Sequence, residues 1–290
     1  MMKNMFITAM CICLMTLAGC NKASADTDVV NARAKAELSR KYPDATNVKW
    51  LSKNGYIVAK FNTQAIRSFG SDYDFSVWFS GDGEWRMTES EVAYDALPEP
   101  VKAAFRASGY ADWRVDDIDR LERAGMETFY VIEVETRTGN IEREADLYYS
   151  ETGVLIKTVL DEDADYDYGD CLPSDIRTDL KSLIAKMYPG AKIVDVEYER
   201  ASVEVEIIHD GRGKDVYFDR DYRWTRTEWD VRRSELPAAV AAKISSSWPG
   251  WRTDDSEYVE TPSSVWYAIE LEKGESELKV RISPDGTVLP

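Results

Sequence analysis

An internal repeat constrains the fold of this chain more than any other feature of its sequence. The segment 77–101 aligns without gaps on the segment 216–240. Within that segment Trp85 matches Trp224, Thr88 matches Thr227, and Leu97-Pro98 matches Leu236-Pro237. Farther along the chain, Trp113 matches Trp251, and residues 129–135 match 266–272. Self-similarity at a fixed spacing indicates duplicated structural units that fold alike.

The repeat predicts two homologous domains, which agrees with the length of 290 residues. We expect the first domain to span 26–160 and the second to span 172–290, with an acidic linker over 161–171. Four hairpin-like turns recur in the chain, so each domain is itself expected to be doubled. They lie at 79–85, 149–155, 218–224 and 282–288.

The hydrophobic periodicity places a helix before each group of strands. Residues 28–42 carry Val30, Ala34 and Leu38 on one stripe, and Pro43 ends the pattern. Segments such as 203–207 and 278–282 alternate apolar and charged residues, which is typical of antiparallel strands with one solvated face. The predicted fold class is α+β, with tandem helix-backed antiparallel β-sheets built from duplicated α-β-β-β(β) units. By this alternation Trp85 and Trp224 face the helices.

The order of these motifs resembles the PepSY-like, beta-lactamase-inhibitor-like secreted proteins. The residues that carry the resemblance are Tyr42, Pro43, Ala45, Trp85, Leu97, Pro98 and Val101, and again Tyr188, Pro189, Ala191, Trp224, Leu236, Pro237 and Val240. The resemblance covers nearly all of the mature chain, and it implies a non-enzymatic binding module, sometimes an inhibitor of an enzyme. It supplies no catalytic residues. The chain departs from the pattern at Asp221-Tyr222, which replaces the Asp-Gly turn, so we expect a bulged hairpin there.

The N-terminus has the pattern of a secretory signal, with Lys3, an apolar run over 5–17 and small residues before Cys20. Residues 17–20 resemble the bacterial lipobox, which implies a signal peptide over 1–19 and lipidation of Cys20. An ordinary signal peptide that ends near a chance cysteine is the alternative. Asn21 favours the outer membrane, and Asp26 and Asp28 hint at export to the surface. The protein is therefore expected in the cell envelope, facing the periplasm or the cell surface.

The charge and the scarcity of His and Cys exclude several functions. A formal net charge of −17 argues against nucleic-acid binding. The only membrane contact expected is through the N-terminal lipid that the lipobox implies. There are one His and four Cys, and Cys171 is the only thiol expected in the mature protein outside Cys20. A disulfide, a zinc site and a Cys–His dyad with His209 are therefore not expected. We expect no enzyme, although paired carboxylates leave a hydrolase open.

The acidic run at 161–170 suggests weak calcium ligands at Asp161, Asp163 and Asp165. The run fails the EF-hand pattern, because Tyr168 stands where glycine is required and Ser174 where a bidentate glutamate is required. A solvated acidic linker explains the run as well. We therefore expect no cofactor and keep Ca²⁺ as an alternative.

Strand alternation gives the candidate binding residues. If Val77 and Phe79 face the helices, Trp78 faces away from them, and the same rule applies to the other units. The outward aromatic residues are then Trp78, Phe129, Tyr148, Tyr217 and Trp266. Tyr and Trp dominate protein-binding surfaces, so we predict a protein partner on the open sheet faces. Cross-strand aromatic pairing without a partner is one alternative. A glycan-binding surface lipoprotein and a weak calcium-binding envelope protein are others.

Overall fold

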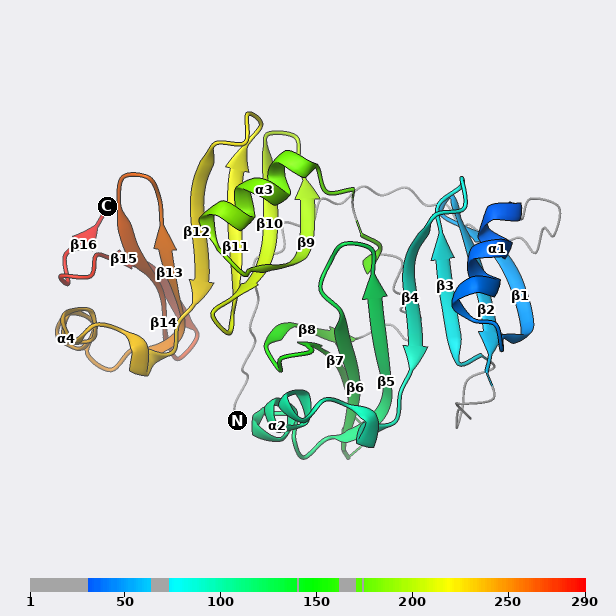
Figure 1. The fold of residues 1–290 in the computed structure, drawn as a ribbon. Helices are drawn as coiled ribbons and strands as arrows, with labels where there is room; N and C mark the ends of the chain where they lie inside the picture. Colours follow the sequence, from blue (N-terminus) through cyan, green and yellow to red (C-terminus); the bar gives the residue numbers. More distant parts are fainter. Residues whose placement is uncertain (1–30, 64–72, 140, 162–170, 174) are drawn as a thin grey trace. The chain divides into compact units, whose positions relative to one another are not determined.

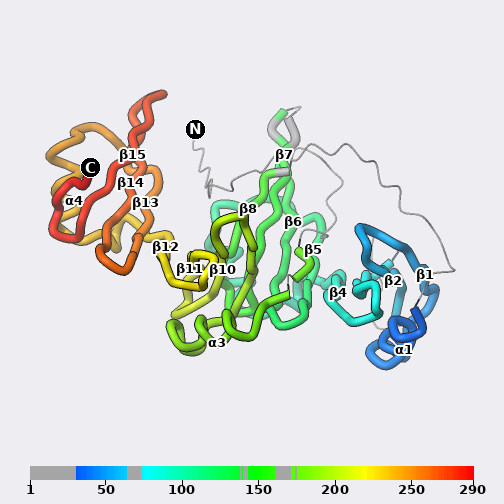
Figure 2. Tube along the Cα trace, turned by 90° about the horizontal axis from the view of Figure 1, so that it is seen from above, coloured from blue at the N-terminus to red at the C-terminus, as the bar shows by residue number. Residues whose placement is uncertain are grey.

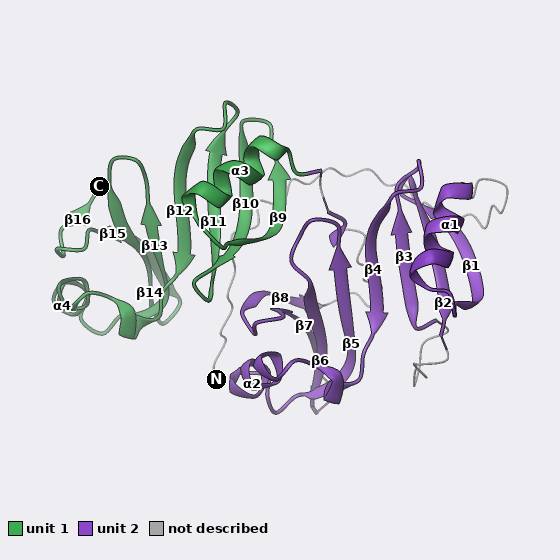
Figure 3. Ribbon diagram, viewed as in Figure 1, with its two compact units in different colours: residues 1–12, 176–290 green, residues 13–175 purple. Residues whose placement is uncertain are grey.

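The computed structural model describes residues 31–63, 73–139, 141–161, 171–173 and 175–290. The described chain forms two compact units, divided between Asp175 and Ile176 (Figure 3). We call them the N-terminal unit (31–175) and the C-terminal unit (176–290). The predicted signal peptide, Cys20 and most of the predicted acidic linker lie outside the described residues.

The N-terminal unit contains two helices and an eight-stranded antiparallel sheet in which every strand pairs with its neighbours in sequence (Figure 1). Its elements are α1 (Ala32–Lys41), β1 (Thr46–Lys53), β2 (Tyr56–Asn62), β3 (Phe75–Phe79), β4 (Trp85–Glu91), the 3₁₀ turn η2 (Tyr94–Ala96), α2 (Glu99–Ala107), β5 (Arg114–Arg123), β6 (Phe129–Thr138), β7 (Ile141–Ser150) and β8 (Leu155–Asp161).

The C-terminal unit has the same order of elements and the same meander topology. Its elements are α3 (Thr178–Met187), β9 (Lys192–Tyr198), β10 (Ser202–His209), β11 (Arg212–Asp219), β12 (Trp224–Asp230), η4 (Arg233–Glu235), α4 (Ala238–Ser247), β13 (Arg252–Glu260), β14 (Val265–Lys273), β15 (Ser276–Ile282) and β16 (Val288–Leu289). These two helix-and-sheet units confirm the predicted two-domain α+β class.

Each helix packs its apolar stripe on one side of a sheet. Ala34 and Leu38 of α1 lie on β2 and β3, and Figure 2 shows α1 alongside β1 and β2. Val101 and Phe105 of α2 form a second core with β5–β7. Helices α3 and α4 do the same in the C-terminal unit through the buried residues Leu180, Ile184, Val240 and Ile244. Burial of these stripes supplies most of the stability of such short helices.

A buried threonine ties helix, hairpin and strand together in both units. Thr88 Oγ1 accepts hydrogen bonds from the Tyr42 hydroxyl at 3.0 Å and from Trp85 Nε1 at 2.9 Å. In the C-terminal unit Trp224 Nε1 lies 2.9 Å from Thr227 Oγ1, and the Tyr188 hydroxyl lies 2.6 Å from it. Both indole rings pack against the helix-side cores, as the strand alternation predicts.

The hairpin turns close on the first turns of the helices. A Cβ atom on Gly83 would lie 2.8 Å from the Ala34 nitrogen, and one on Gly153 would lie 2.4 Å from the Pro100 oxygen. Tyr222 takes the left-handed conformation (φ 57°) in the turn that lacks glycine. The register shift beside that turn, between Tyr217 and Phe218, also occurs between Trp78 and Phe79. The irregularity is therefore common to both hairpins and is not caused by the Asp221-Tyr222 departure.

Candidate functional site

The open face of each sheet is the face that points away from the helices. In the N-terminal unit Trp78, Phe129 and Tyr148 do lie on this face, but their exposed fractions are only 2%, 3% and 0%. They form a core with Val58, Met87, Leu121, Val131 and Cys171. The expectation that these three aromatic residues are accessible to a partner is therefore wrong.

The physical reason is that the open face of the N-terminal sheet is apolar over several neighbouring strands. Trp78 lies directly opposite Val58 on one strand and Met87 on the other. Burying such a patch is favourable by about 25 cal/mol per Å² of apolar surface. Cys171 and Leu172 pack on the patch from the segment after β8. The sequence predicts Cys171 in the linker and Leu172 in the second domain, whereas the structure groups both with the N-terminal unit.

Tyr217 and Trp266, the two candidates in the C-terminal unit, are half-buried and reach solvent. The Arg226 guanidinium lies 3.8 Å from the centroid of the Tyr217 ring, and that of Arg281 lies 5.9 Å from the Trp266 centroid. The Tyr217 hydroxyl also donates to Glu204 at 3.1 Å. Both aromatic residues therefore lie among charged side chains, and the partner contact predicted for them stays a prediction.

Around them, the open face of the C-terminal sheet carries a row of acids that the sequence analysis did not single out. Direct cross-strand neighbours run across β9–β14 in the order Asp195, Glu206, Asp215, Glu228, Val259 and Trp266. We call the four acids of this series, Asp195, Glu206, Asp215 and Glu228, the carboxylate row. Glu204 lies opposite Glu197 in the next row, and Asp230 lies opposite Glu257. Strand alternation already places these acids outward, but only the register shows that they are opposite one another.

The electrostatics of this face favour protonated carboxyl groups. Burial, with the neighbouring Glu206 and Glu204 carboxylates, raises the pKa of Asp215 to about 8. Burial and the Glu228 carboxylate raise the pKa of Glu257 to about 7, and burial beside Asp255 raises that of Asp230 to about 6. Arg226 makes an ion pair with Glu228 at 2.9 Å. At neutral pH Asp215 therefore keeps its proton, whereas Asp230 is mostly ionised.

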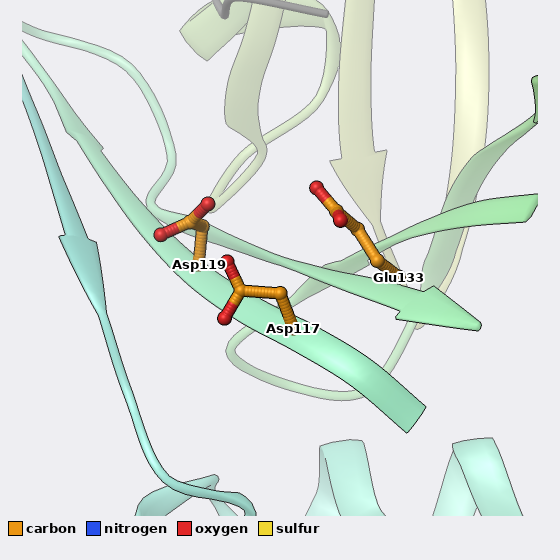
Figure 4. A group of neighbouring side chains, drawn as sticks. All are labelled: Asp117, Asp119 and Glu133. Carbon is orange, nitrogen blue, oxygen red and sulfur yellow. The ribbon is translucent and has the colours of Figure 1, made fainter. Parts of the chain in front are cut away.

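Two acidic groups have oxygen atoms close enough to share a cation. Asp117 and Asp119 from β5 and Glu133 from β6 place carboxylate oxygens within 4.8 Å of one another, on the same side of the strands (Figure 4). Asp117 and Asp119 are two residues apart on β5, so strand alternation places them on the same side. Burial raises the pKa of Asp117. The second group is Glu197, Glu199 and Glu204 in the C-terminal unit.

Oxygen ligands of this kind suit hard cations such as Ca²⁺, which takes six to eight of them. Each group offers three, so water or a partner would have to supply the rest. The calcium candidates from the sequence are not placed: Asp163 and Asp165 lie outside the described residues, and only the backbone of Asp161 is described, at the end of β8.

The only histidine and the only described cysteine have structural surroundings. Cys171 is 6% exposed and packs among the apolar residues of the N-terminal open face. The His209 ring contacts Tyr188 edge-on at 5.4 Å, and its Nδ1 lies 3.2 Å from Lys214 Nζ. Cys171 thus lies in a hydrophobic core, and His209 lies at the end of β10.

Comparison with known proteins assigns the family. The profile of the beta-lactamase-inhibitor-like, PepSY-like family matches residues 55–157 and 204–289, one segment in each unit. The chain belongs to this family. No curated protein matches the sequence. Within the described part of the chain, no helix is long and apolar enough to cross a membrane.

Several solved structures with similarity to this PepSY-like chain come from Bacteroides species. A DUF2874 family protein from Bacteroides ovatus is 31% identical, with 44% of this chain and 86% of that chain covered and a TM-score of 0.38. A BLIP-like protein from Bacteroides fragilis is 32% identical, with coverage of 46% and 87% and a TM-score of 0.39. A protein described as periplasmic, from Bacteroides eggerthii, is 23% identical, with coverage of 45% and 88% and a TM-score of 0.40.

Proposed function

We propose that this protein is a non-catalytic, lipid-anchored binding module of the cell envelope, and that it engages a protein partner through the open face of its C-terminal sheet. The observation that carries the proposal is the contrast between the two open faces. The N-terminal face is closed by Cys171 and Leu172, whereas Tyr217 and Trp266 of the C-terminal face remain accessible to solvent. Accessible aromatic residues within a polar rim are typical of protein-binding surfaces.

Family membership and the repeated element order support the rest of the proposal. The two units would derive from duplication of a helix followed by four strands, since this order occurs four times. The signal pattern and Cys20 would place the protein on the outer membrane, facing the periplasm or the cell surface. One similar protein is described as periplasmic and another as BLIP-like, which agrees with an envelope protein that could inhibit an enzyme.

A glycan ligand has less support from this geometry. A sugar ring stacks on the open face of an aromatic side chain, but the guanidinium of Arg226 covers the Tyr217 ring at 3.8 Å. That of Arg281 lies over Trp266. A glycan would have to displace both groups before it could stack.

Affinity capture from envelope extract tests the binding face. The full chain, a Tyr217→Ala/Trp266→Ala variant and a Tyr198→Ala variant serve as baits. Tyr198 is 44% exposed and lies opposite Val203, a residue of the helix-side core, so it controls for loss of an exposed tyrosine on the other side of the sheet. We expect the double variant to lose a partner that Tyr198→Ala retains. Equal recovery by all three baits would exclude the open face.

Labelling with radioactive palmitate tests the anchor separately. We expect the wild-type chain to take up label and to fractionate with membranes, and Cys20→Ser to lose both properties. A labelled Cys20→Ser protein would contradict lipidation at this cysteine.

A further inference from the structure

Strand β15 has one side that its own sheet covers only in part. It follows β14 through an exposed turn that contains Glu275, and it pairs with β14 along its whole length. On its other side, β16 pairs only with Arg281 and Ile282. In the described part of the chain, no strand pairs with Ser276–Val280 on that side. We call this uncovered side of Ser276–Val280 the β15 edge.

The backbone of the β15 edge directs hydrogen-bonding groups away from its own sheet. Ser283, which continues the line of β15, donates its backbone N–H to the Thr287 oxygen on the β16 side at 2.9 Å. Alternate residues of a strand direct their N–H and C=O groups to the same side. Glu277 and Lys279 therefore direct theirs to the β16 side as well, beyond the reach of the two-residue β16. An open row of this kind is a template for another strand.

The other edges of the two sheets are less regular. The sheets also end in β1, β8 and β9, and each of these strands has a register shift against its neighbour. Such bulges are one way in which proteins prevent an edge from pairing with another chain. By contrast, β15 pairs with β14 and with β16 without any shift. The β15 edge is therefore the edge best suited to accept a strand.

The repeat shows that the charges of this edge differ from those of its covered counterpart. The equivalent strand of the N-terminal unit is β7, and β8 covers it along Glu144–Tyr149. In the alignment of the turns that follow β7 and β15, Glu277 corresponds to Glu144. Lys279 corresponds to Asp146. The covered strand thus has two acids, whereas the uncovered strand has an acid and a lysine two residues apart.

We propose that the β15 edge pairs with the same edge of a second copy of this chain, antiparallel and centred on Leu278. In this register Glu277 of each copy lies opposite Lys279 of the other. These are the residues that direct their backbone groups outward, so each pair can exchange both main-chain hydrogen bonds. The interface is two-fold symmetric, as is usual for dimers of identical chains.

Charge complementarity selects both the occupant and the register. A centre one residue earlier would place Glu277 opposite itself, and a centre one residue later would do so for Lys279. Like charges directly opposite each other destabilise a strand pair, whereas opposite charges stabilise it. Glu277 already lies opposite Glu272 of β14, so a lysine from the second copy would offset that repulsion. Lys279 pairs with Glu270 at 3.0 Å, but its side chain is 78% exposed and can reach a neighbouring strand as well.

The side chains also determine how the two sheets would join. Leu278 and Val280 pack on the helix-side core with α4. Leu278 opposite its own copy therefore places both α4 helices on one side of a continuous sheet. The two open faces, with Tyr217 and Trp266, then point in the same direction. This inference goes beyond the proposed function, because such a dimer offers a partner two binding faces at once and raises its avidity.

Oxidative cross-linking of the full chain in detergent tests the pairing. Leu278→Cys places a thiol on the two-fold axis, so we expect it to form a disulfide-linked dimer when copper phenanthroline is the oxidant. Ser276→Cys is the matched control on the same edge and the same side of the strand. The two copies of residue 276 would lie about 14 Å apart along the strands, so this variant should not cross-link. Wild type, whose Cys171 is buried, gives the background.

Charge exchange tests the register, with sedimentation of the full chain as the readout. Glu277→Lys and Lys279→Glu each place like charges opposite each other, and each should lower the self-association constant about tenfold or more. A mixture of the two variants restores both opposite-charge pairs and should associate as wild type does. The mixture still lacks one Lys279–Glu270 ion pair, so its recovery would come from the interface. Thermal unfolding checks that both variants are folded.

Three results would overturn the proposal. The first is a wild-type chain that stays monomeric in sedimentation and a Leu278→Cys variant that does not cross-link. The second is equal cross-linking of Leu278→Cys and Ser276→Cys, which would indicate random collision. The third is a mixture of the charge variants that associates no better than either variant alone. None of these results would affect the proposed function, because Tyr217 and Trp266 lie on the open face and are tested by envelope capture.

Discussion

At the scale of single residues, the repeat preserves groups that hold different elements together. Thr88 is 2% exposed and Thr227 is 0% exposed, and each is within hydrogen-bond distance of both a Tyr hydroxyl and a Trp indole nitrogen. One buried hydroxyl thus connects the end of a helix to a hairpin and a strand. This explains why Tyr, Trp and Thr recur together in both copies.

We predict that Thr88→Val lowers the free energy of unfolding by about 2–4 kcal/mol. Valine has nearly the same shape but cannot accept the bonds from Tyr42 and Trp85, and a buried polar group left unpaired costs about 1–3 kcal/mol. Urea denaturation measures the change. Thr225→Val is the control, because the Thr225 hydroxyl is exposed and its bond to the Tyr217 carbonyl can be replaced by water. Equal losses in both variants would contradict this role of Thr88.

Two glycines provide a second test at this scale. Gly83 and Gly55 both have positive φ, at 86° and 83°. A Cβ on Gly83 would also collide with the Ala34 nitrogen at 2.8 Å, whereas nothing lies within 4 Å of one on Gly55. Both alanine variants should lose about 1–2 kcal/mol to the left-handed conformation. We predict a larger loss for Gly83→Ala, and denaturation curves with equal midpoints for the two variants would contradict it.

At the scale of the strand and the sheet, register decides the chemistry of the open faces. Strand alternation assigns Asp215 to a face, but it does not show which acids lie opposite it on β10 and β12. Those neighbours, together with burial, raise the pKa of Asp215 to about 8. A residue that looks like an ordinary surface acid in sequence therefore becomes a proton-holding group.

We predict that the C-terminal unit loses stability as pH rises from about 5 to 8. The unfolded chain releases the Asp215 proton near the ordinary value of 3.8, whereas the native protein keeps it until about pH 8. The native state then binds more protons throughout this window, so the free energy of unfolding falls with pH. One such proton gives a slope of at most about 1.4 kcal/mol per pH unit.

Urea denaturation of the full chain across this pH range measures the slope. Asp215→Asn should flatten it and should be more stable than wild type at pH 8, because the amide never ionises. Glu275→Gln, at the exposed turn, should keep the wild-type slope. A wild-type stability that rises between pH 5 and 8 would show that the Asp215 proton is not retained.

At the scale of the whole molecule, the two homologous units differ in what closes their open faces. The N-terminal face is apolar around Trp78 and Tyr148, and Cys171 and Leu172 pack on it. In the C-terminal unit the equivalent face is charged. The N-terminal unit therefore has apolar packing on both faces of its sheet, whereas the C-terminal unit has one polar face that reaches solvent.

We predict that a fragment of residues 26–160 is markedly less stable than a fragment of residues 26–175. The shorter fragment lacks Cys171 and Leu172, so the apolar face around Trp78 becomes exposed. Thermal unfolding and binding of a hydrophobic dye report the difference. As a control, a fragment of residues 176–290 should be about as stable as a fragment of residues 172–290. Equal stability of 26–160 and 26–175 would show that the covering segment is not part of this unit's fold.

The sequence by itself determined the family, the two-domain α+β class and the inward positions of Trp85 and Trp224, because helical and strand periodicity act locally and the repeat shows them twice. It also placed Trp78, Phe129 and Tyr148 correctly on the face away from the helices. Only the tertiary structure decided that these residues are buried, since residues far along the chain, Cys171 and Leu172 among them, pack on the same face. It alone revealed the carboxylate row, because cross-strand register brings together residues on separate strands whose charges interact only once the sheet has formed.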